Sequence, residues 1–448
     1  MKFSTLWLTL IVAGLSGCQA LSPKDHRPSM DAAIASQSHW NSLPQGQAST
    51  SLYELVPLPQ LTPLIQTSLS NNPDLAQTRL TLSILYASRR QSLGARLPTV
   101  DLNLQGQDQE SADTSYQAGI TVGWELDIWG KLTDADAAAR LDSAAGAADL
   151  QGARDLLAAN VIRGYLQLAL QQQLMNVERR RLTVLEQNEA LILSRYARGL
   201  GSLYELDNAR SNTAANRATL TTVGEQLAQA QRNLRQLLGD RDADLPTPEA
   251  FPDVMLPLAK FPEQDLGRRP DLISAYLGTQ AASKRASVAY KSMLPSLSIS
   301  ATLADQGANL SDSLFASPVW SLLGQLTAPL YRGGQLKAAA DIAELTAEQQ
   351  YWSYRSTLLD AVLEVDAALS KERQLTLSQQ HLADAVTSAK RSSASYQQRY
   401  RQGLVTMQDL LSIQQQQFDR ESQWITETYN RLVNRVDLGL ALGLGVQS

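Results

Sequence analysis

The stretch that decides the fold reads Ser115-Tyr116-Gln117-Ala118-Gly119-Ile120-Thr121-Val122-Gly123-Trp124-Glu125-Leu126-Asp127. Apolar or aromatic residues alternate with polar or small ones along its length. Because successive side chains of a strand point to opposite faces, this period of two predicts a β-strand with one apolar and one polar face. Residues 99–107 alternate in the same way, so the sequence predicts a pair of strands of roughly ten residues each.

The strand pair lies in a unit that occurs twice in the 448 residues. Asn72-Pro73-Asp74-Leu75 returns as Arg269-Pro270-Asp271-Leu272, and Leu238-Gly239 returns as Leu442-Gly443. A period of about 200 residues is far longer than that of a solenoid, so it indicates duplication of a domain-sized unit.

Proline-free segments follow each strand pair, and they predict long helices. No proline lies between Pro98 and Pro246 or after Pro329, and apolar residues recur there every seven positions. Spacing by seven is typical of helical hairpins that supercoil. The expected organisation begins with a signal peptide at 1–17 and an extended acylated segment at 18–62. Repeat 1 is expected at 63–245, with strands 99–107 and 115–127 and helices 131–199 and 203–239. After a linker at 246–262, repeat 2 is expected at 263–448, with strands 296–304 and 318–328 and helices 334–402 and 406–442.

Aromatic residues on the apolar strand faces distinguish two interpretations of the sheet. A half-buried sheet over a soluble core accounts for one isolated strand pair. Four strands of membrane-spanning length that carry Tyr116, Trp124 and Trp320 favour a lipid-facing wall. Four strands do not close a barrel, and an open strand edge is not stable in lipid. The wall is therefore expected to be shared between two, three or four chains, which would give 8, 12 or 16 strands.

The N-terminus has the pattern of a targeting segment. Lys2 precedes an apolar run that is too short to span a membrane, and Leu15-Ser16-Gly17-Cys18 follows. This tetrapeptide resembles the bacterial lipobox, which implies a diacylglycerol and an N-acyl chain on Cys18. Gln19, which is not Asp, then implies delivery to the outer membrane of a Gram-negative bacterium. The alternative is an ordinary signal followed by a buried cysteine.

Composition argues against several classes of function. With 39 Lys and Arg against 44 Asp and Glu, the formal net charge is −5, so no surface for nucleic acid is expected. Three histidines, one cysteine and six scattered methionines make a metal site or a soft-metal path unexpected. The sequence shows no phosphate-binding loop, H-E-x-x-H motif or G-x-S-x-G elbow. We therefore expect neither enzymatic activity nor a cofactor besides the acyl chains.

Three segments carry a resemblance to a known family: Trp124-Glu125-Leu126-Asp127-Ile128-Trp129-Gly130-Lys131, Arg268-Arg269-Pro270-Asp271 and Pro329-Leu330-Tyr331-Arg332-Gly333-Gly334. Together with the duplicated strands and hairpins, they resemble the TolC-type outer membrane factors, in particular the lipoprotein branch that serves tripartite (RND-type) drug-efflux pumps. The resemblance implies a mixed α+β membrane protein with four transmembrane strands and long coiled-coil hairpins in each chain. It also implies a homotrimer with a 12-stranded β-barrel in the outer membrane and a 12-helix periplasmic tunnel.

The function that the resemblance implies is that of a passive exit duct and not of an enzyme. Drugs or toxic compounds would arrive from an inner-membrane efflux pump through a periplasmic adaptor protein, and their export would contribute to antibiotic resistance. A lipid-anchored periplasmic coiled-coil scaffold is an alternative, but it leaves the strands unexplained. Within the channel class, a metal-ion duct and a type I protein-secretion duct also stay open.

The resemblance further implies that the turns of the hairpins contact the adaptor and form the periplasmic gate. The matching turn residues are Arg198, Gly199, Leu200, Gly403 and Leu404.

Four residues near these turns match family positions at the gate. Asp409 matches an aspartate that lines the closed aperture, and three copies would form a cation-attracting ring. The alternative for Asp409 is a charge at a helix N-terminus that the helix dipole favours. Ser412 stands where a second aspartate is common. Tyr400 and Glu205 match residues that tie one hairpin to the other in the closed state, although Val405 stands where some members place an arginine of this lock.

Overall fold

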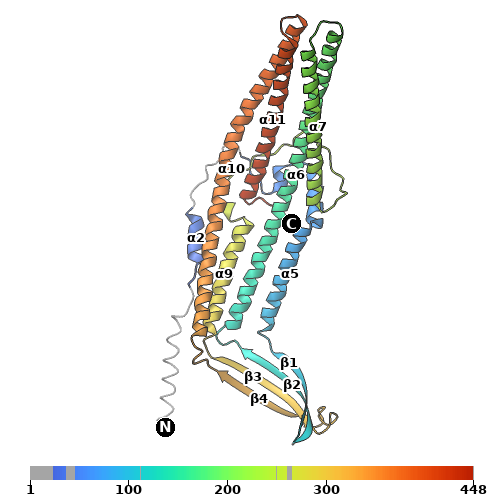
Figure 1. Cartoon of the computed structure of the whole chain (residues 1–448). Coiled ribbons are helices and arrows are strands. Elements are labelled where there is room, and N and C mark those ends of the chain that lie inside the picture. Colours follow the sequence, from blue (N-terminus) through green and yellow to red (C-terminus); the bar gives the residue numbers. More distant parts are fainter. Residues whose placement is uncertain (1–23, 37–45, 111, 249, 260–264, 447–448) are drawn as a thin grey trace. The chain divides into compact units, whose positions relative to one another are not determined.

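The computed structural model describes residues 24–36, 46–110, 112–248, 250–259 and 265–446 (Figure 1). The expected signal peptide at 1–17 and the expected lipid-attachment residue Cys18 lie outside the described residues. In chain order the elements are α2 (Arg27–Ala35), α3 (Leu52–Leu55), α4 (Leu61–Asn71), α5 (Pro73–Gly94), β1 (Thr99–Gln109), β2 (Ala112–Leu126), α6 (Lys131–Ala197), α7 (Leu203–Leu238), α9 (Pro270–Lys291), β3 (Ser296–Gly307), β4 (Val319–Thr327), α10 (Gln335–Arg401) and α11 (Met407–Ala441).

The chain divides into two compact units. Unit 1 consists of Met1–Ser36, Arg79–Asp149 and Asp271–Leu358, and unit 2 consists of Gln37–Thr78, Leu150–Pro270 and Leu359–Ser448. Each unit takes segments from both sequence repeats, so compactness does not follow the duplication. Among the described residues, no helix combines the length and the apolar character that a membrane span requires.

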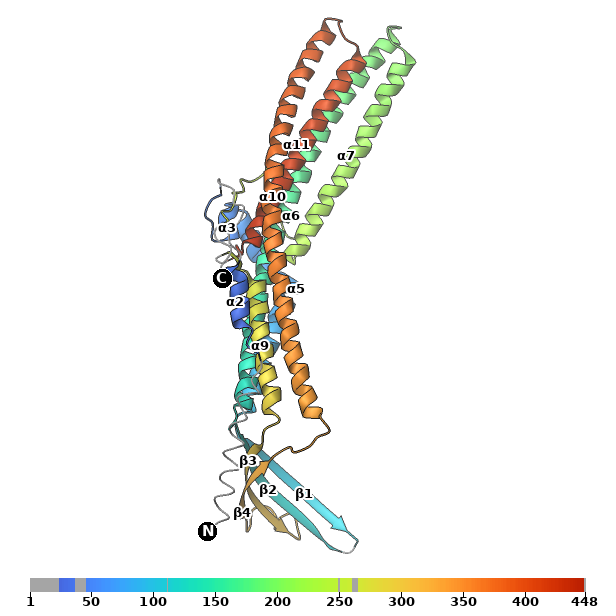
Figure 2. The same ribbon diagram turned by 90° about the vertical axis from the view of Figure 1, so that its left-hand side faces the viewer.

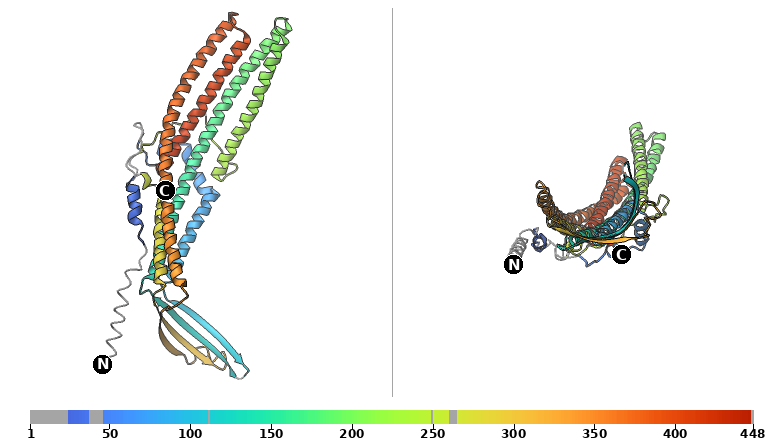
Figure 3. Two further views of the ribbon diagram at one scale, coloured as in Figure 1. Left: turned by 60° about the vertical axis from the view of Figure 1, so that its left-hand side comes forward. Right: turned by 90° about the horizontal axis from the view of Figure 1, so that it is seen from below.

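Unit 1 contains one antiparallel sheet in the order β1-β2-β3-β4, and Figure 3 shows that this sheet is curved. Its register places apolar residues side by side across all four strands in two rows. One row consists of Leu102, Ile120, Leu303 and Trp320, and a second row on the same face consists of Val100, Val122, Ala301 and Leu322. All eight residues are exposed, and the seven besides Ala301 have between 37% and 76% of their surface accessible.

The opposite face of the sheet is more polar, although Val319 and Leu323 of β4 also lie on it. Asp101, Thr121, Thr302 and Ser321 form one row there, and the hydroxyl oxygens of Thr121 and Thr302 lie 3.3 Å apart within hydrogen-bonding distance. The strands therefore carry the two different faces that their alternation predicts. The expected fold class, helical hairpins combined with four antiparallel strands in a mixed α+β chain, is confirmed.

The segment expected to be extended at 18–62 contains α2, α3 and the start of α4 in its described part, so that expectation was wrong. Pro28 lies in the first turn of α2, where proline is compatible with a helix.

Helix α2 packs in unit 1 against α9 and α10. Met30 is fully buried and Ala33 is 5% exposed, so α2 presents one apolar side to its neighbours. The ring of His26, just before the helix, stacks on the ring of Tyr351 with 4.9 Å between the centroids. These contacts fix the N-terminal end of the described chain on the helices of unit 1.

Unit 2 consists of two helical hairpins and the short elements around their bases. Within it, α6 is followed by α7 and α10 by α11 (Figure 2). The apolar residues of α11 that recur every seven positions, Leu411, Phe418, Ile425 and Leu432, are all less than 9% exposed. The main core joins α3, α4, α6, α7 and α11 through residues such as Leu52, Ile65, Leu166, Leu234 and Val436.

Candidate functional site at the hairpin tips

Both hairpins of unit 2 reverse direction by the same turn. Gly199 and Gly403 have φ angles of +73° and +74°, which a residue with a Cβ adopts only at a cost. In each turn the following leucine donates its backbone N–H to a carbonyl five residues earlier: Leu200 to Arg195 at 2.9 Å, and Leu404 to Arg399 at 3.0 Å. This is the Schellman ending of a helix, and it uses carbonyls that would otherwise lack a partner.

The expected tip residues lie on the surface of these turns. Arg198, Gly199, Leu200, Gly403 and Leu404 are all exposed. The two leucines are 66% and 69% exposed, and Tyr204 nearby is 70% exposed. The tips therefore present apolar side chains and a basic residue to their surroundings.

The helices that leave the turns begin with matching capping boxes. The Ser202 hydroxyl accepts the Glu205 backbone N–H at 3.1 Å, and the Ser202 backbone N–H donates to the Glu205 carboxylate at 3.0 Å. Thr406 and Asp409 exchange the same two hydrogen bonds at 3.2 and 3.0 Å, and the Thr406 hydroxyl also donates to Asp409 at 2.6 Å. These bonds satisfy backbone donors at the helix start.

The cap changes the acidity of Asp409. Hydrogen bonds donated by the Thr406 hydroxyl and backbone N–H lower the pKa of the Asp409 carboxyl below its ordinary value of 3.8. Asp409 and Ser412 are both exposed and lie three residues apart, so they share one face of α11.

Beneath the turns, residues from both hairpins form one apolar cluster, here called the tip cluster. Its buried members are Leu185, Ile192, Leu206, Ala209, Met407, Leu410 and Leu411. The rings of Tyr396 and Tyr400 pack against it from α10. A cavity of about 120 Å³ beside the cluster is lined by residues of both hairpins, among them Tyr204, Glu205 and Thr406.

The structure brings Tyr400 and Glu205 to the same end of unit 2 but does not join them. Tyr400 is half-buried against the tip cluster, whereas the Glu205 carboxylate is engaged by its own helix cap. Within the described residues, no hydrogen bond connects the two side chains. The lock between them stays a prediction.

Two ion pairs that sequence reasoning missed join the hairpins below the tip cluster. Arg180 of α6 pairs with Glu421 of α11 at 2.6 Å, and Arg181 pairs with Asp419 at 2.7 Å. The Arg181 guanidinium also lies over the ring of Phe418, 5.7 Å from its centroid. The only sequence signal was opposite charge on two predicted helices, which does not say which helices are neighbours.

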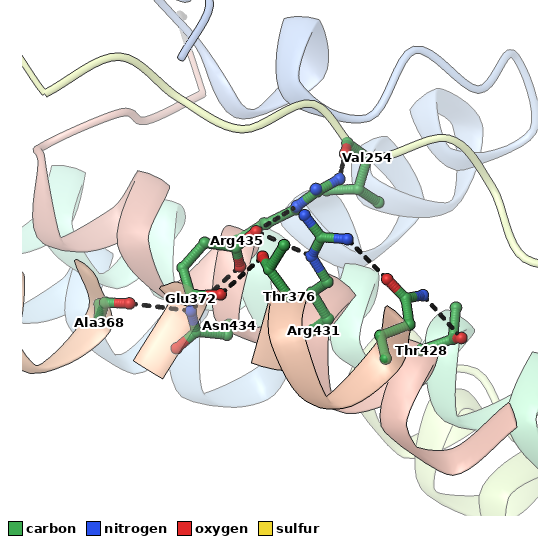
Figure 4. Close-up of polar contacts among 9 residues, drawn as sticks. Val254, Ala368, Glu372, Thr376, Thr428, Arg431, Asn434 and Arg435 are labelled. Carbon is green, nitrogen blue, oxygen red and sulfur yellow. Dashed lines mark hydrogen bonds and ion pairs between the residues drawn. The ribbon is translucent and has the colours of Figure 1, made fainter. Parts of the chain in front are cut away.

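A buried ionic cluster holds the base of the α10–α11 hairpin (Figure 4). Glu372 is 1% exposed and accepts hydrogen bonds from Arg431 at 2.9 Å and from Arg435 at 3.2 Å. Arg435 also donates to the backbone carbonyl of Val254, which ties the segment before residue 259 to α11. Burial lowers the pKa of Arg435. Because two arginines share one carboxylate, removal of Glu372 would leave both charges unpaired.

Comparison with known proteins gives these features a context. Residues 64–240 and 261–444 match the model of the family described as "Outer membrane efflux protein". The pyoverdine export outer membrane protein OpmQ of Pseudomonas putida is 29% identical over 410 residues, with 87% of each chain covered. The probable outer membrane lipoprotein SilC of Salmonella typhimurium is 26% identical, with 96% of each chain covered.

A further relative and a solved structure are also similar to this chain. The cation efflux system protein CusC of Escherichia coli O6:H1 is 27% identical, with 87% of this chain and 86% of that protein covered. A crystal structure of CusC superposes with a TM-score of 0.83 at 24% identity, over 90% of this chain and 97% of that chain. The class of protein is therefore an outer membrane efflux protein. The chain belongs to the outer membrane efflux protein family, which confirms the resemblance found in the sequence.

Proposed function

We propose that this protein is the outer membrane exit duct of a tripartite efflux system and that it conducts toxic organic compounds, drugs among them. The observation that carries the proposal is the sheet of unit 1. One face shows two continuous apolar rows with high exposure, and the other carries the polar row of Asp101, Thr121, Thr302 and Ser321. A sheet with lipid on one side and water on the other has this distribution.

A homotrimer accounts for the two free edges of the sheet. Strand β1 pairs only with β2, and β4 pairs only with β3, among the strands that the structure describes. Three copies joined β1 to β4 would close a barrel of 12 strands with a water-filled interior. Exposed apolar side chains on the helices of unit 1, such as Leu80 and Ile84 of α5 and Ile342 and Leu345 of α10, support the same contact between copies.

The hairpin tips are proposed as the gate and as the contact with a periplasmic adaptor, which would link the duct to an inner-membrane pump. Exposed Leu200 and Leu404 supply apolar contact area on neighbouring turns. Asp409 would face its copies around the threefold axis and attract cations, with Ser412 beside it. In the closed state, the Tyr400 hydroxyl would donate to the Glu205 carboxylate.

Acylation of Cys18 is part of the proposal. The similarity to a protein named as an outer membrane lipoprotein supports it, as does the lipobox-like sequence before the cysteine. Diacylglycerol and an N-acyl chain would hold the N-terminus in the periplasmic leaflet of the outer membrane.

Metal-ion export is the second candidate, because a cation efflux protein is among the relatives. The two cargoes predict different phenotypes. Deletion of the protein in its host is expected to increase susceptibility to dyes, detergents and antibiotics. Increased susceptibility to silver or copper alone would favour the cation duct.

Reconstitution of the purified protein in planar bilayers tests the channel itself. We expect a trimer that resists SDS until heated and single channels that prefer cations. Asp409→Asn is expected to weaken the cation preference, whereas Asp384→Asn, which removes the same charge from an exposed position of α10 away from the tip, is the control. Tyr400→Phe is expected to increase the open time if the lock exists. Absence of conductance in both the unaltered trimer and the Tyr400→Phe variant would exclude the proposed duct.

A further inference from the structure

A groove rich in cations lies in unit 1 between the segment that leads into α2 and one face of α9. Its volume is about 370 Å³, and its basic lining residues are Lys24, Arg27, Lys284 and Lys291. The side chains of Lys284, Ser287 and Lys291 are spaced by three and four residues, so they line the groove from a single face of α9. Figure 2 shows α2 alongside α9.

The second wall of the groove is held in place by packing. His26 is 4% exposed and stacked on Tyr351, and Met30 is fully buried. Lys24 and Arg27 flank this buried histidine on both sides. Their ammonium and guanidinium groups are therefore presented over α9 by a docked segment and not by a free tail.

Positive charge exceeds negative charge among the groups that line the groove or pair with its cations. Lys284 and Lys291 both pair with the same carboxylate, Asp134 of α6, and the Lys284 contact is 3.0 Å. Arg27 pairs with Asp25 at 2.7 Å. Within the lining itself, four basic residues accompany one acidic residue, Asp25, whereas Asp31, Glu344 and Glu348 act on Arg27 and His26 without lining the groove. Four basic groups in the lining favour an anionic ligand, because an ammonium group binds phosphate oxygens by charge-assisted hydrogen bonds.

The groove lies near the C-terminal end of α9, which leads into the sheet of unit 1. Helix α9 ends at Lys291, and β3 begins at Ser296. The Lys291 ammonium donates to the backbone carbonyl of Gly130 at 3.2 Å, in the connection between β2 and α6. In the same region, the Trp129 indole N–H donates to the Pro295 carbonyl at 2.6 Å. Tryptophan with a satisfied N–H is typical of the level where a membrane meets water.

We propose that this groove binds the headgroup phosphate of an anionic phospholipid in the periplasmic leaflet of the outer membrane. The inference rests on the proposed function, since it places the strands in that membrane. Besides its cations, the groove has an apolar part, formed by the partly exposed side chain of Leu141 beside the buried Met30. A ligand with a phosphate and an adjoining apolar part matches both kinds of lining, whereas free phosphate matches only the cations.

Native mass spectrometry of the full-length, delipidated protein in detergent tests the proposal. The probes are phosphatidylglycerol and phosphatidylcholine of equal chain length. The variant is Lys24→Gln with Lys284→Gln, which leaves Lys291 to pair with the buried Asp134. The matched control is Lys337→Gln with Lys371→Gln, which removes two exposed lysines outside the groove. We expect phosphatidylglycerol to bind the groove variant about tenfold more weakly than the control, with phosphatidylcholine binding unchanged.

Two results would overturn the proposal. One is equal phosphatidylglycerol affinity in the groove variant and the control. The other is displacement of the lipid by inorganic phosphate at equal concentration, which would assign the groove to the free ion. Conductance is measured on the same samples and separates this inference from the proposed function. Conducting channels without a lipid preference overturn only the groove, whereas failure of both the unaltered protein and Tyr400→Phe to conduct overturns the duct.

Discussion

Glu205 and Asp409 occupy the same position in the two hairpins: each is the third residue of its helix, and each carboxylate accepts the backbone N–H of the residue that caps that helix. The duplication of the chain has thus preserved a pair of capping boxes at the two tips. The carboxylates expected at the gate also have a local structural role. Substitution at either position therefore changes both a surface charge and a helix start, and experiments on the gate need to separate the two effects.

The first prediction concerns acid. The folded-state pKa of Asp409 lies below the ordinary value of 3.8, so its contribution to stability is present above that value and is lost as the pH falls through the folded-state pKa. The first turn of α11 is expected to fray at pH below about 3.8. Amide hydrogen exchange, expressed as protection factors, measures this fraying. Asp409→Asn should remove most of the pH dependence of that turn, and an unchanged pH profile in the variant would contradict the assignment.

The second prediction concerns the ion pairs between the hairpins. Arg180→Gln with Arg181→Gln removes the pairs with Glu421 and Asp419, as well as the contact over Phe418. Each exposed pair contributes about 0.2–1 kcal/mol, so the tips are expected to separate more often without general unfolding. Single-channel recording should show a higher open probability. Arg179→Gln is the control, since Arg179 is the neighbouring exposed arginine, and an equal change in the control would refute a specific role for the pairs.

The third prediction concerns the buried cluster at the base of the α10–α11 hairpin. Glu372→Ala leaves Arg431 and Arg435 without their shared carboxylate in a buried site. Loss of one partner from such a cluster costs about 3–5 kcal/mol. Thermal unfolding followed by circular dichroism should show a large loss of stability. Lys371→Ala, which changes the adjacent exposed residue of the same helix, should leave the unfolding curve almost unchanged.

The fourth prediction distinguishes the two faces of the sheet. Leu102 belongs to an apolar row, and Asn103, its neighbour in β1, belongs to the opposite face. If the apolar face contacts lipid, Leu102→Arg should destabilise the folded channel by about 2–4 kcal/mol, whereas Asn103→Arg should cost little. Folding into phospholipid vesicles in a urea titration measures both values. Equal effects of the two substitutions would exclude a lipid-facing role for that row.

Much of the fold was predictable because its signals are local. Alternation along residues 115–127 predicted a strand, and the structure has β2 at Ala112–Leu126. Gly199 and Gly403 were predicted as reversals, and both have the positive φ angle that this role requires. The heptad seam of α11 predicted which of its residues would be buried, since a spacing of seven selects one helix face. Both the fold class and the family followed from such patterns.

The candidate site was only partly predictable. The tip residues and Asp409 were singled out by resemblance, but their roles in a gate stay predictions. The capping role of Glu205 was not foreseen, although Ser202 three residues earlier was the available signal. Arg181 and Glu372 gave no signal, because a charged residue on a predicted helix is usually solvated, and its partner lies on another element.

The sequence by itself determined much of the local structure of this protein: which segments alternate as strands, where the four helices of the long hairpins lie, and where glycine permits a reversal. These features depend on residues a few positions apart, so they can be recognised in the chain alone. Only the tertiary structure decided that β2 pairs with β3 across the two repeats, that α6 is tied to α11 by Arg181 and Asp419, and that two arginines share Glu372. Such contacts join residues far apart in the chain, and they form only when packing has brought their elements together.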